Sequence, residues 1–214
     1  SNPDPNLDYY YDFTQSIEEY QQVFTELNLP WKWQPVTIDN YKNIILEIFS
    51  EGQKGEVFPL VLNLCDGDEI NGAPGISVIK ELNKRNLIYT GADDFFYEIT
   101  TSKIPMKVAF DKLKVATPNW EHIKEKNIDA NFLFNKLGTP VIVKPAVSGG
   151  SLGVGIKNVV EKEEELLQQI DKMFEGYRGW NLSAEGIIAE SFIDGPEYTV
   201  IQTCALPIYC NDCG

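Results

Sequence analysis

The sequence lacks long apolar runs and is short of basic residues. No apolar stretch approaches the roughly 20 residues that a helix needs to cross a bilayer. Only 18 lysines and arginines stand against 32 aspartates and glutamates, which gives a formal net charge of −14. Such a balance disfavours a polyanion as the main partner, whereas a nucleotide needs only local positive charge. We therefore expect neither a nucleic-acid nor a membrane partner.

Cysteine and histidine are also scarce. Cys65 ends an apolar run, while Cys204, Cys210 and Cys213 crowd the last eleven residues, and this distribution is not a disulfide framework. The three late cysteines could form part of a zinc site, but zinc needs four ligands and no fourth has a matching spacing, so we predict no metal site within the chain. The single histidine, His122, is predicted on a surface helix in a structural role, because no serine or cysteine partner is near it in the sequence.

What remains is an ordinary globular composition, 43% hydrophobic and 12% aromatic, in a chain long enough for one large core or two small ones. Apolar residues at helical spacing predict helices over 16–27, 39–49, 75–85, 102–113, parts of 120–137, and 161–177. Alternating or β-branched runs predict strands over 31–36, 57–64, 87–89, 141–145, 156–160, 186–194 and 197–204. The strand–helix alternation before residue 90 predicts a parallel βαβ sheet, with strand 57–64 buried on both faces.

The most informative stretch reads Val-Ile-Val-Lys-Pro-Ala-Val-Ser-Gly-Gly-Ser-Leu-Gly-Val-Gly and runs from Val141 to Gly155. A β-branched run ends at Lys144 and Pro145, and a loop with four glycines follows. Glycines let backbone N–H groups come close to an anion, while the lysine supplies a compact positive charge. The pattern predicts a loop that binds phosphate.

Two common phosphate-binding motifs do not fit this loop. A P-loop requires a lysine where Ile156 stands. A dinucleotide-binding motif requires a helix directly after the glycines, whereas residues 156–160 are β-branched and alternating and predict a strand. A glycine loop between two strands leaves the protein-kinase and ATP-grasp arrangements. In protein kinases the lysine follows the glycine loop in a later strand, but Lys144 precedes it here.

Six short runs occur in an order and spacing that resemble the ATP-grasp superfamily, specifically the D-alanine:D-alanine ligases. They are Asn63-Leu-Cys-Asp-Gly67 with Asn71-Gly72, Tyr89-Thr-Gly91, Ser102-Lys103 with Lys107, Thr117-Pro118, the stretch 141–155, and Glu190-Ser-Phe-Ile-Asp-Gly-Pro-Glu197 with Thr199-Val200. The similarity covers roughly residues 57–200. It implies an α/β fold, with a parallel βαβ pre-ATP-grasp domain followed by the first part of an α+β ATP-grasp domain.

The resemblance also implies domain limits. Residues 1–100 would be the pre-ATP-grasp, or substrate, domain without its first strand, and residues 101–203 the amino-terminal and central part of the ATP-grasp domain. Residues 204–214 do not continue the family pattern, and their Ala-Leu-Pro-Ile run is what a common sequencing adapter encodes when translated. We expect this tail to be non-native and the family's magnesium ligands to lie beyond the end of the chain.

The roles of the site residues are likewise implied by the resemblance. Lys103 and Lys144 would contact the nucleotide phosphates, and Lys144 also the adenine side. The loop backbone would cover the γ-phosphate, and Ser151 is the candidate catalytic side chain. The remaining nucleotide-binding residues are Gly149 and Gly150 in the loop, the strand edge Glu190, Ser191, Phe192 and Ile193 around adenine, and Glu197 at the ribose hydroxyls.

The implied reaction is ATP-dependent amide formation through an acyl phosphate, with ATP and Mg²⁺ as cofactors and an amino acid, D-alanine among the candidates, as the small-molecule substrate. The chain alone is expected to bind ATP without turning it over. Gly150 stands where the ligases carry a serine, and the family's amino-terminal glycine-rich strand is not found. A ligase for another amino acid or carboxylate, and a non-catalytic nucleotide-binding module, therefore stay open. A cytoplasmic location is expected, and a homodimer is allowed for.

Overall fold

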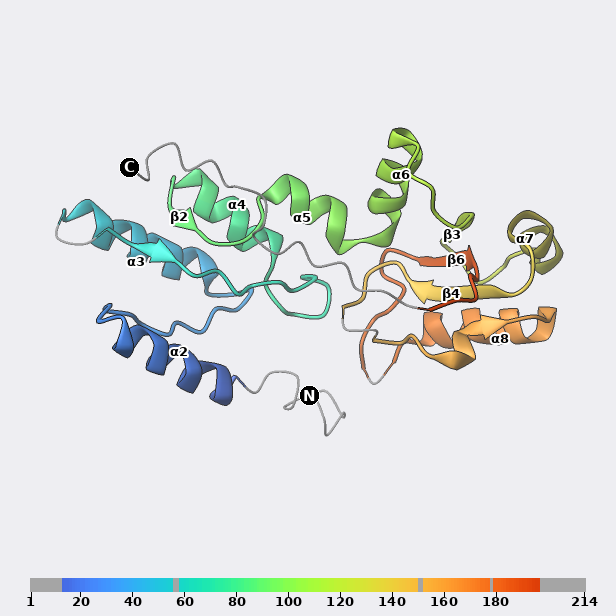
Figure 1. Cartoon of the computed structure of the whole chain (residues 1–214), viewed down its shortest axis with the longest axis horizontal. Coiled ribbons are helices and arrows are strands. Elements are labelled where there is room, and N and C mark those ends of the chain that lie inside the picture. Colours follow the sequence, from blue (N-terminus) through green and yellow to red (C-terminus); the bar gives the residue numbers. More distant parts are fainter. Residues whose placement is uncertain (1–12, 56–57, 150–151, 178, 197–214) are drawn as a thin grey trace.

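The computed structural model describes residues 13–55, 58–149, 152–177 and 179–196, which form two lobes at opposite ends of an elongated molecule (Figure 1). The first lobe contains α2 (Thr14–Glu26), α3 (Tyr41–Gln53), β1 (Leu60–Val61), α4 (Ile76–Lys84) and β2 (Ile88–Tyr89). The second contains β3 (Trp120–Ile123), α7 (Ala130–Leu137), β4 (Val141–Pro145), the 3₁₀ turn η1 (Ile156–Asn158), β5 (Val159–Val160), α8 (Glu163–Glu175) and β6 (Ile187–Ser191). Helices α5 (Asp94–Thr101) and α6 (Lys103–Leu113) connect them. The chain is thus mixed α and β, as predicted.

The first lobe is built on a small core. Strands β1 and β2 pair in parallel, and α4 lies between them in the sequence. The buried residues Ile45, Val78 and Leu82 from α3 and α4 form its core cluster. The strand predicted over 57–64 is only two residues long, and Leu60 is 66% exposed. Burial on both faces is therefore wrong, because in the described part of the chain β1 has one strand neighbour and no second layer over its outer face.

The strand predicted over 31–36 is also wrong. This segment has no regular structure, and its alternating tryptophans pack on a helix instead of a sheet. The Trp31 and Phe24 ring centroids are 5.4 Å apart, and those of Trp33 and Tyr20 are 6.5 Å apart. Alternation of large and polar residues arises whenever an extended segment lies along an apolar surface, so the pattern alone could not identify the surface.

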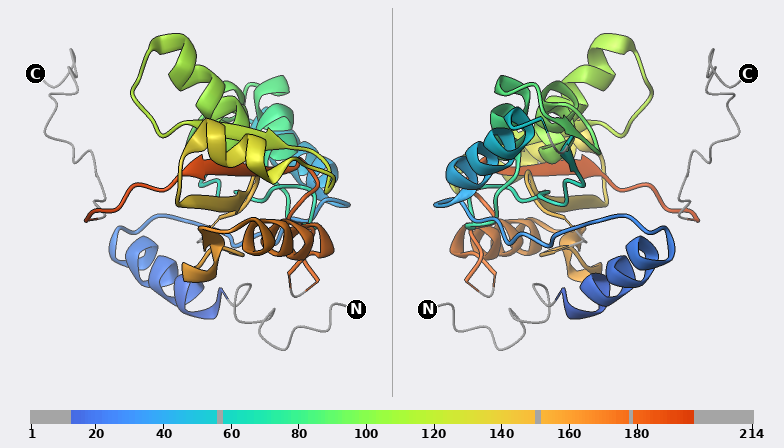
Figure 2. Two further views of the ribbon diagram at one scale, coloured as in Figure 1. Left: turned by 90° about the vertical axis from the view of Figure 1, so that its right-hand side faces the viewer. Right: turned by 90° about the vertical axis from the view of Figure 1, so that its left-hand side faces the viewer.

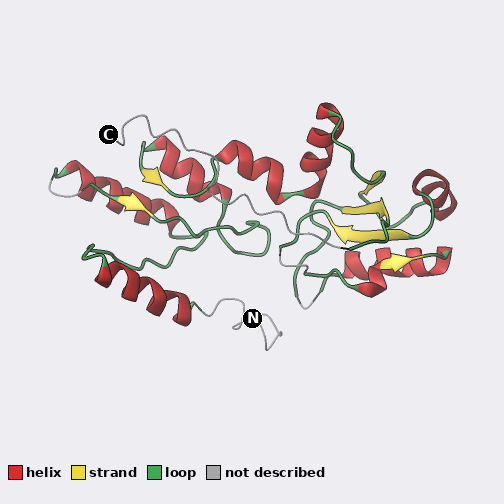
Figure 3. Ribbon diagram, viewed as in Figure 1, coloured by secondary structure: helices red, strands yellow, loops and turns green. Residues whose placement is uncertain are grey.

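The second lobe is a four-stranded antiparallel sheet in the order β3-β6-β4-β5 (Figure 3). Helices α7 and α8 cover one face and share a core cluster with alternate residues of the strands, including Val141, Val143, Ile187 and Ala189. Helix α6 stands on the other side of the sheet from α8 (Figure 2). The residues between the buried ones, such as Lys144 and Glu190, therefore point toward the α6 side.

Two further predictions in this lobe need correction. Trp120–Ile123 forms strand β3 rather than a helix, because it pairs in antiparallel register with β6, and His122 therefore lies on a strand. The strand predicted over 156–160 begins with η1 and is regular only at Val159–Val160, where β5 pairs with β4. The predicted strand 197–204 and the tail 204–214 lie outside the described residues.

The two lobes meet close to the start of α6. The backbone N–H of Lys103 donates to the carbonyl of Ala146 over 2.8 Å, and Ser102 forms a β-bridge with Val147. A second contact joins the loop before α4 to the loop before β6, where the N–H of Asn181 donates to Oδ1 of Asn71 over 2.8 Å. In the part of the chain that the structure describes, none of the helices has the length and apolar character needed to cross a membrane.

Candidate functional site

The end of strand β4 and the start of helix α6 bring lysines together. In β4 the buried residues Val141, Val143 and Pro145 face α7 and α8, so Lys144 points to the opposite face. Helix α6 begins at Lys103 after the N-cap Ser102, and Lys107 follows one turn later on the same helix face. The hydrogen bond from Lys103 N–H to Ala146 anchors this helix end two residues beyond Lys144.

Glu190 on β6 lies among these lysines. It is 4% exposed, and its register partner on β4 is Ile142, so it points to the same face as Lys144. One carboxylate oxygen accepts from Lys107 Nζ at 2.6 Å, and the other pairs with Lys144 Nζ. Burial acts to raise the pKa of Glu190, but the hydrogen bonds from Lys107 and Lys144 outweigh it and hold this pKa below the usual value. Glu190 is therefore an anion at neutral pH.

The three lysines of the cluster are not equivalent. Lys107 is buried and is also held by Thr117 Oγ1 and by the carbonyl of Pro118 at 3.4 Å. Among the described residues, the Lys103 ammonium donates to Ser148, at 3.1 Å to Oγ and 3.4 Å to the carbonyl oxygen. Burial, and then the charge of Lys144, lower the pKa of Lys103. Three ammonium groups thus face one carboxylate, a local excess of positive charge in a protein whose net charge is −14.

The far end of the glycine loop is fastened to β4. Gly153 has φ of +73°, and a Cβ there would lie 2.6 Å from Leu182 Cδ1, so any larger residue would be strained. Asn158 of η1 is buried and donates from Nδ2 to the carbonyls of Val143 and Gly153, at 2.8 and 2.9 Å. Its Oδ1 accepts the N–H of Gly155 at 2.9 Å. These bonds hold residues 153–155 against the strand that carries Lys144.

Several predicted site residues come together and others do not. Lys103, Lys144 and Glu190 belong to one cluster, and Gly149 follows Ser148, which contacts Lys103. Gly150, Ser151 and Glu197 lie outside the described residues, so their roles stay predictions.

The predicted binding of adenine by residues 190–193 stays a prediction, and the sheet places β6 between β3 and β4. Two of the N–H donors of residues 190–193 are already used: Ser191 donates to the carbonyl of Asn119 at 2.9 Å and Phe192 to that of Pro140 at 3.0 Å. Ile193 comes after the end of β6, and its side chain is 67% exposed. Its backbone N–H has no partner among the described residues. Of these backbone N–H donors, that of Ile193 is the one left for adenine. A sequence pattern shows alternation along one strand but not the order of strands in a sheet.

No site role was predicted for Lys107 and Asn158 from the sequence. Lys107 carried a signal, since it follows Lys103 by four residues and so lies on the same helix face. Asn158 carried a weaker one, as a polar residue directly before two valines. Both residues are buried in the structure, and their side chains bond to other residues of the site.

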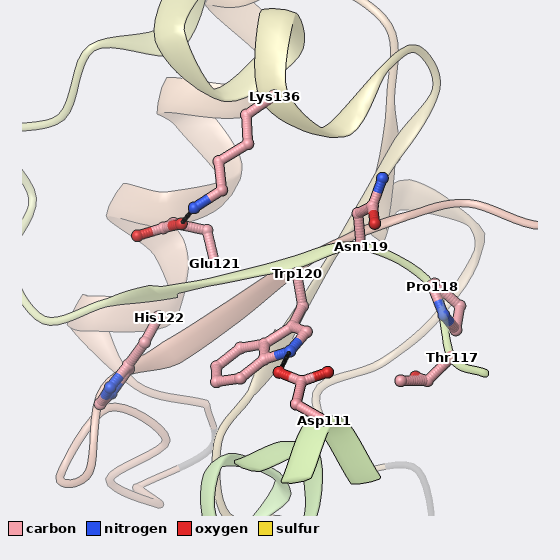
Figure 4. A pocket seen from close by; sticks show the side chains of 8 residues that line it. All are labelled: Asp111, Thr117, Pro118, Asn119, Trp120, Glu121, His122 and Lys136. Atoms are coloured by element: carbon pink, nitrogen blue, oxygen red, sulfur yellow. Dashed lines mark hydrogen bonds and ion pairs between the residues drawn. The ribbon is translucent and has the colours of Figure 1, made fainter. Parts of the chain in front are cut away.

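A separate pocket of about 550 Å³ lies along β3 (Figure 4). Its lining residues are Asp111, Thr117, Pro118, Asn119, Trp120, Glu121, His122 and Lys136. The polar groups in it have partners: Trp120 Nε1 donates to Asp111 at 3.0 Å, Lys136 pairs with Glu121, and His122 Nε2 lies 2.8 Å from the carbonyl of Glu185. None of the predicted nucleotide-binding residues lines it, so the lysine cluster is the better site for an anion.

Known proteins with similar sequences are ligases. Residues 109–203 match the family described as D-ala D-ala ligase C-terminus. The D-alanine--D-alanine ligase of Pseudoalteromonas atlantica is 30% identical over 122 residues, which are 56% of this chain and 35% of that ligase. That of Halalkalibacterium halodurans is 33% identical over 120 residues, 56% of this chain and 36% of the relative.

A solved D-alanine-D-alanine ligase from Helicobacter pylori superposes with a TM-score of 0.49 at 27% identity, covering 64% of this chain and 39% of that one. The chain thus spans about a third of the length of the two relatives from P. atlantica and H. halodurans. The resemblance to D-alanine:D-alanine ligases that the sequence motifs indicate is confirmed.

Proposed function

We propose that this chain forms the phosphate-binding part of the nucleotide site of an ATP-dependent ligase. Such a ligase joins a carboxylate to an amine, as D-alanine:D-alanine ligases do. The observation that carries the proposal is the group of Lys103, Lys107 and Lys144 around the single carboxylate of Glu190. Lys107 and Glu190 neutralise each other in the buried layer. Lys144 and Lys103 are left to meet the nucleotide phosphates.

The lysines act by position and charge. Phosphoryl transfer places negative charge on the equatorial oxygens of the transferring group, and preorganised ammonium groups stabilise that charge without moving. Glu190 holds the Lys144 ammonium in place, while the Lys144 side chain stays 26% exposed and open to a ligand. Transfer of the γ-phosphoryl group to a substrate carboxylate would activate it for attack by an amine, and the amide forms as phosphate leaves.

Mg²⁺ is expected to accompany ATP, but we assign no ligand for it. Both oxygens of Glu190 are occupied by lysines, so this carboxylate does not suit a metal. Across residues 13–55, 58–149, 152–177 and 179–196, no group of three or more His, Cys, Asp and Glu side chains could hold an ion.

Titration calorimetry with ATP tests the phosphate site. Lys144→Ala should weaken ATP binding at least tenfold, roughly the worth of one charge-assisted contact. The variant should remain folded because Glu190 keeps its ion pair with Lys107. Lys172→Ala, an exposed lysine on α8, is the matched control and should bind as the unchanged chain does. Equal heats for the unchanged chain and Lys144→Ala would contradict the proposal.

The amino-acid substrate is tested separately. We propose D-alanine as the first amino acid to examine, since the matched relatives carry that substrate in their names. D-alanine and L-alanine are titrated in parallel by calorimetry in the presence of ATP. A larger heat of binding for D-alanine would support D-alanine as the substrate. A response to L-alanine alone would overturn D-alanine and leave the phosphate site standing.

A further inference from the structure

Asn158 is one of five polar or charged residues that are fully buried among those described, and it does not belong to the lysine cluster. A buried amide costs free energy unless its donors and acceptor are paired. In Asn158 both donors and the acceptor are used, by Val143, Gly153 and Gly155, at 2.8, 2.9 and 2.9 Å. An amide is the side chain that can donate twice and accept once at a single position.

The three partners of Asn158 belong to two different parts of the site. Val143 lies in β4 immediately before Lys144, and Gly153 and Gly155 form the far end of the glycine loop. One planar group therefore fixes the separation between the lysine-bearing strand and this part of the loop. Leu182 packs against Gly153 from another direction, which limits movement on that side.

Among the described residues, the Asn158 amide provides the hydrogen bonds between residues 153–155 and β4, beside the pairing of β5 with β4 and the packing of Gly153 near Pro145. The backbone bond at the start of η1 runs from Asn158 N–H to the carbonyl of Gly155 over 2.9 Å, and it stays within the loop. Lys157 and Ile156, the residues before Asn158, are exposed and point away from β4. Removal of the Asn158 amide would thus free residues 153–155 from the strand while the strand kept its pairing with β6.

We propose that Asn158 is a positioning residue that sets the far end of the glycine loop against Lys144 and so determines how tightly the site grips nucleotide phosphates. The inference rests on the proposed function. It assigns to Asn158 an effect on the phosphates and none on the nucleoside, because its contacts all lie on the phosphate-binding strand and loop.

The test uses the 214-residue chain with two variants at this position. Asn158→Leu fills similar space and removes all three hydrogen bonds, whereas Asn158→Asp keeps the acceptor for Gly155 N–H and loses both donors. Asn127→Leu and Asn127→Asp, at an exposed position, are the matched controls. ATP and adenosine are titrated by calorimetry, and amide hydrogen exchange of Gly155 is followed without nucleotide.

We expect Asn158→Leu to weaken ATP binding about tenfold, because two or three hydrogen bonds that position the phosphate-binding loop are lost. Adenosine binding should change less than twofold. Gly155 N–H should exchange faster in Asn158→Leu and keep its protection in Asn158→Asp. Equal losses for ATP and adenosine would indicate general destabilisation and overturn the proposal.

The two proposals fail in different ways. If the unchanged chain binds ATP and Asn158→Leu binds it equally well, the role of Asn158 is overturned and the phosphate site stands. If the unchanged chain shows no preference for ATP over adenosine, the proposed function itself is overturned, and the positioning role falls with it.

Discussion

Glu190 is the residue on which the arrangement of charges depends. A carboxylate buried between Lys107 and Lys144 is stable only as an ion pair, since an uncompensated buried charge is costly in a low-dielectric environment. Removal of its charge would leave two ammonium groups facing each other near a third, Lys103. The stability of this region should therefore depend on the ionisation of Glu190.

Glu190→Gln should lower the free energy of unfolding at pH 7 by about 3 kcal/mol, the scale measured when one partner of a buried pair is removed. Because the folded-state pKa of Glu190 lies below the unfolded value, its contribution is fully present above about pH 4.3 and is lost as pH falls through the folded pKa. Urea unfolding at several pH values should show the difference between the two chains shrinking toward acid.

Glu125→Gln, at an exposed position, is the control for that series and should change stability little at any pH. A Glu190→Gln difference that stays constant from pH 7 to strong acid would show that the carboxylate does not contribute through its charge.

At this scale the strand end and glycine loop around Lys144 indicated its phosphate role, whereas Lys103 was assigned through the family resemblance. The sequence could not show that the Glu190 side chain neutralises Lys107, since that pairing joins residues 83 positions apart through the packing of α6 on the sheet. For the same reason the sequence did not predict the ion pairs of the Glu190 side chain.

The glycine loop and its two anchoring elements determine the site at the level of secondary structure. Strand β4 was predicted at its observed bounds, because β-branched residues bounded by Gly-Thr-Pro and by a glycine loop give a clear signal. The segment after the loop was predicted as a strand, yet it begins with the turn η1. Apolar alternation could not reveal that the Asn158 side chain would compete with sheet pairing for backbone groups.

Gly153→Ala should lower the free energy of unfolding by about 1 to 2 kcal/mol, since an alanine is strained at φ of +73° and its Cβ would collide with Leu182. Gly149→Ala, in the same loop, is the matched control because its Cβ would have nothing within 4 Å and its φ is not positive. Thermal unfolding of the two variants measures the difference. If Gly153→Ala proved as stable as Gly149→Ala, the fastening of the loop to Leu182 would be wrong.

The whole molecule places a small cationic site on a strongly acidic protein. Composition argues against a polyanionic partner without excluding a nucleotide, since net charge says nothing about local clusters. The mixed α and β character was predictable from hydrophobic periodicity, whereas the extent of the first lobe was not. Its two-residue strands β1 and β2 depend on tertiary pairing, and sequence runs such as 57–64 overstate the regular structure that forms.

The two-lobed arrangement also explains why the cluster needs the complete packing of the chain. Lys103 and Lys107 come from the helix that connects the lobes, and Lys144 and Glu190 come from the second lobe's sheet. Lysines elsewhere, such as Lys80 beside Glu98 and Lys172 on α8, are exposed and lie outside this cluster. A phosphate-directed reagent should therefore distinguish one set of lysines from the rest.

An acyl phosphate of ATP tests the central claim most directly, because it transfers its acyl group to a lysine amine held beside the nucleotide phosphates. An amide bond forms, the acyl–phosphate bond breaks, and ATP leaves as the amine proton is released. Lys103 should be the main labelled residue, since its lowered pKa favours the neutral, nucleophilic amine, with Lys144 second.

Mass spectrometry of the digested protein reads out the labelled positions, and excess ATP should suppress labelling at both residues. The predicted result is ATP-protected modification of Lys103 and Lys144 with little at Lys80 or Lys172. Labelling spread over the exposed lysines and unchanged by ATP would contradict the assignment of the lysine cluster as a nucleotide-phosphate site.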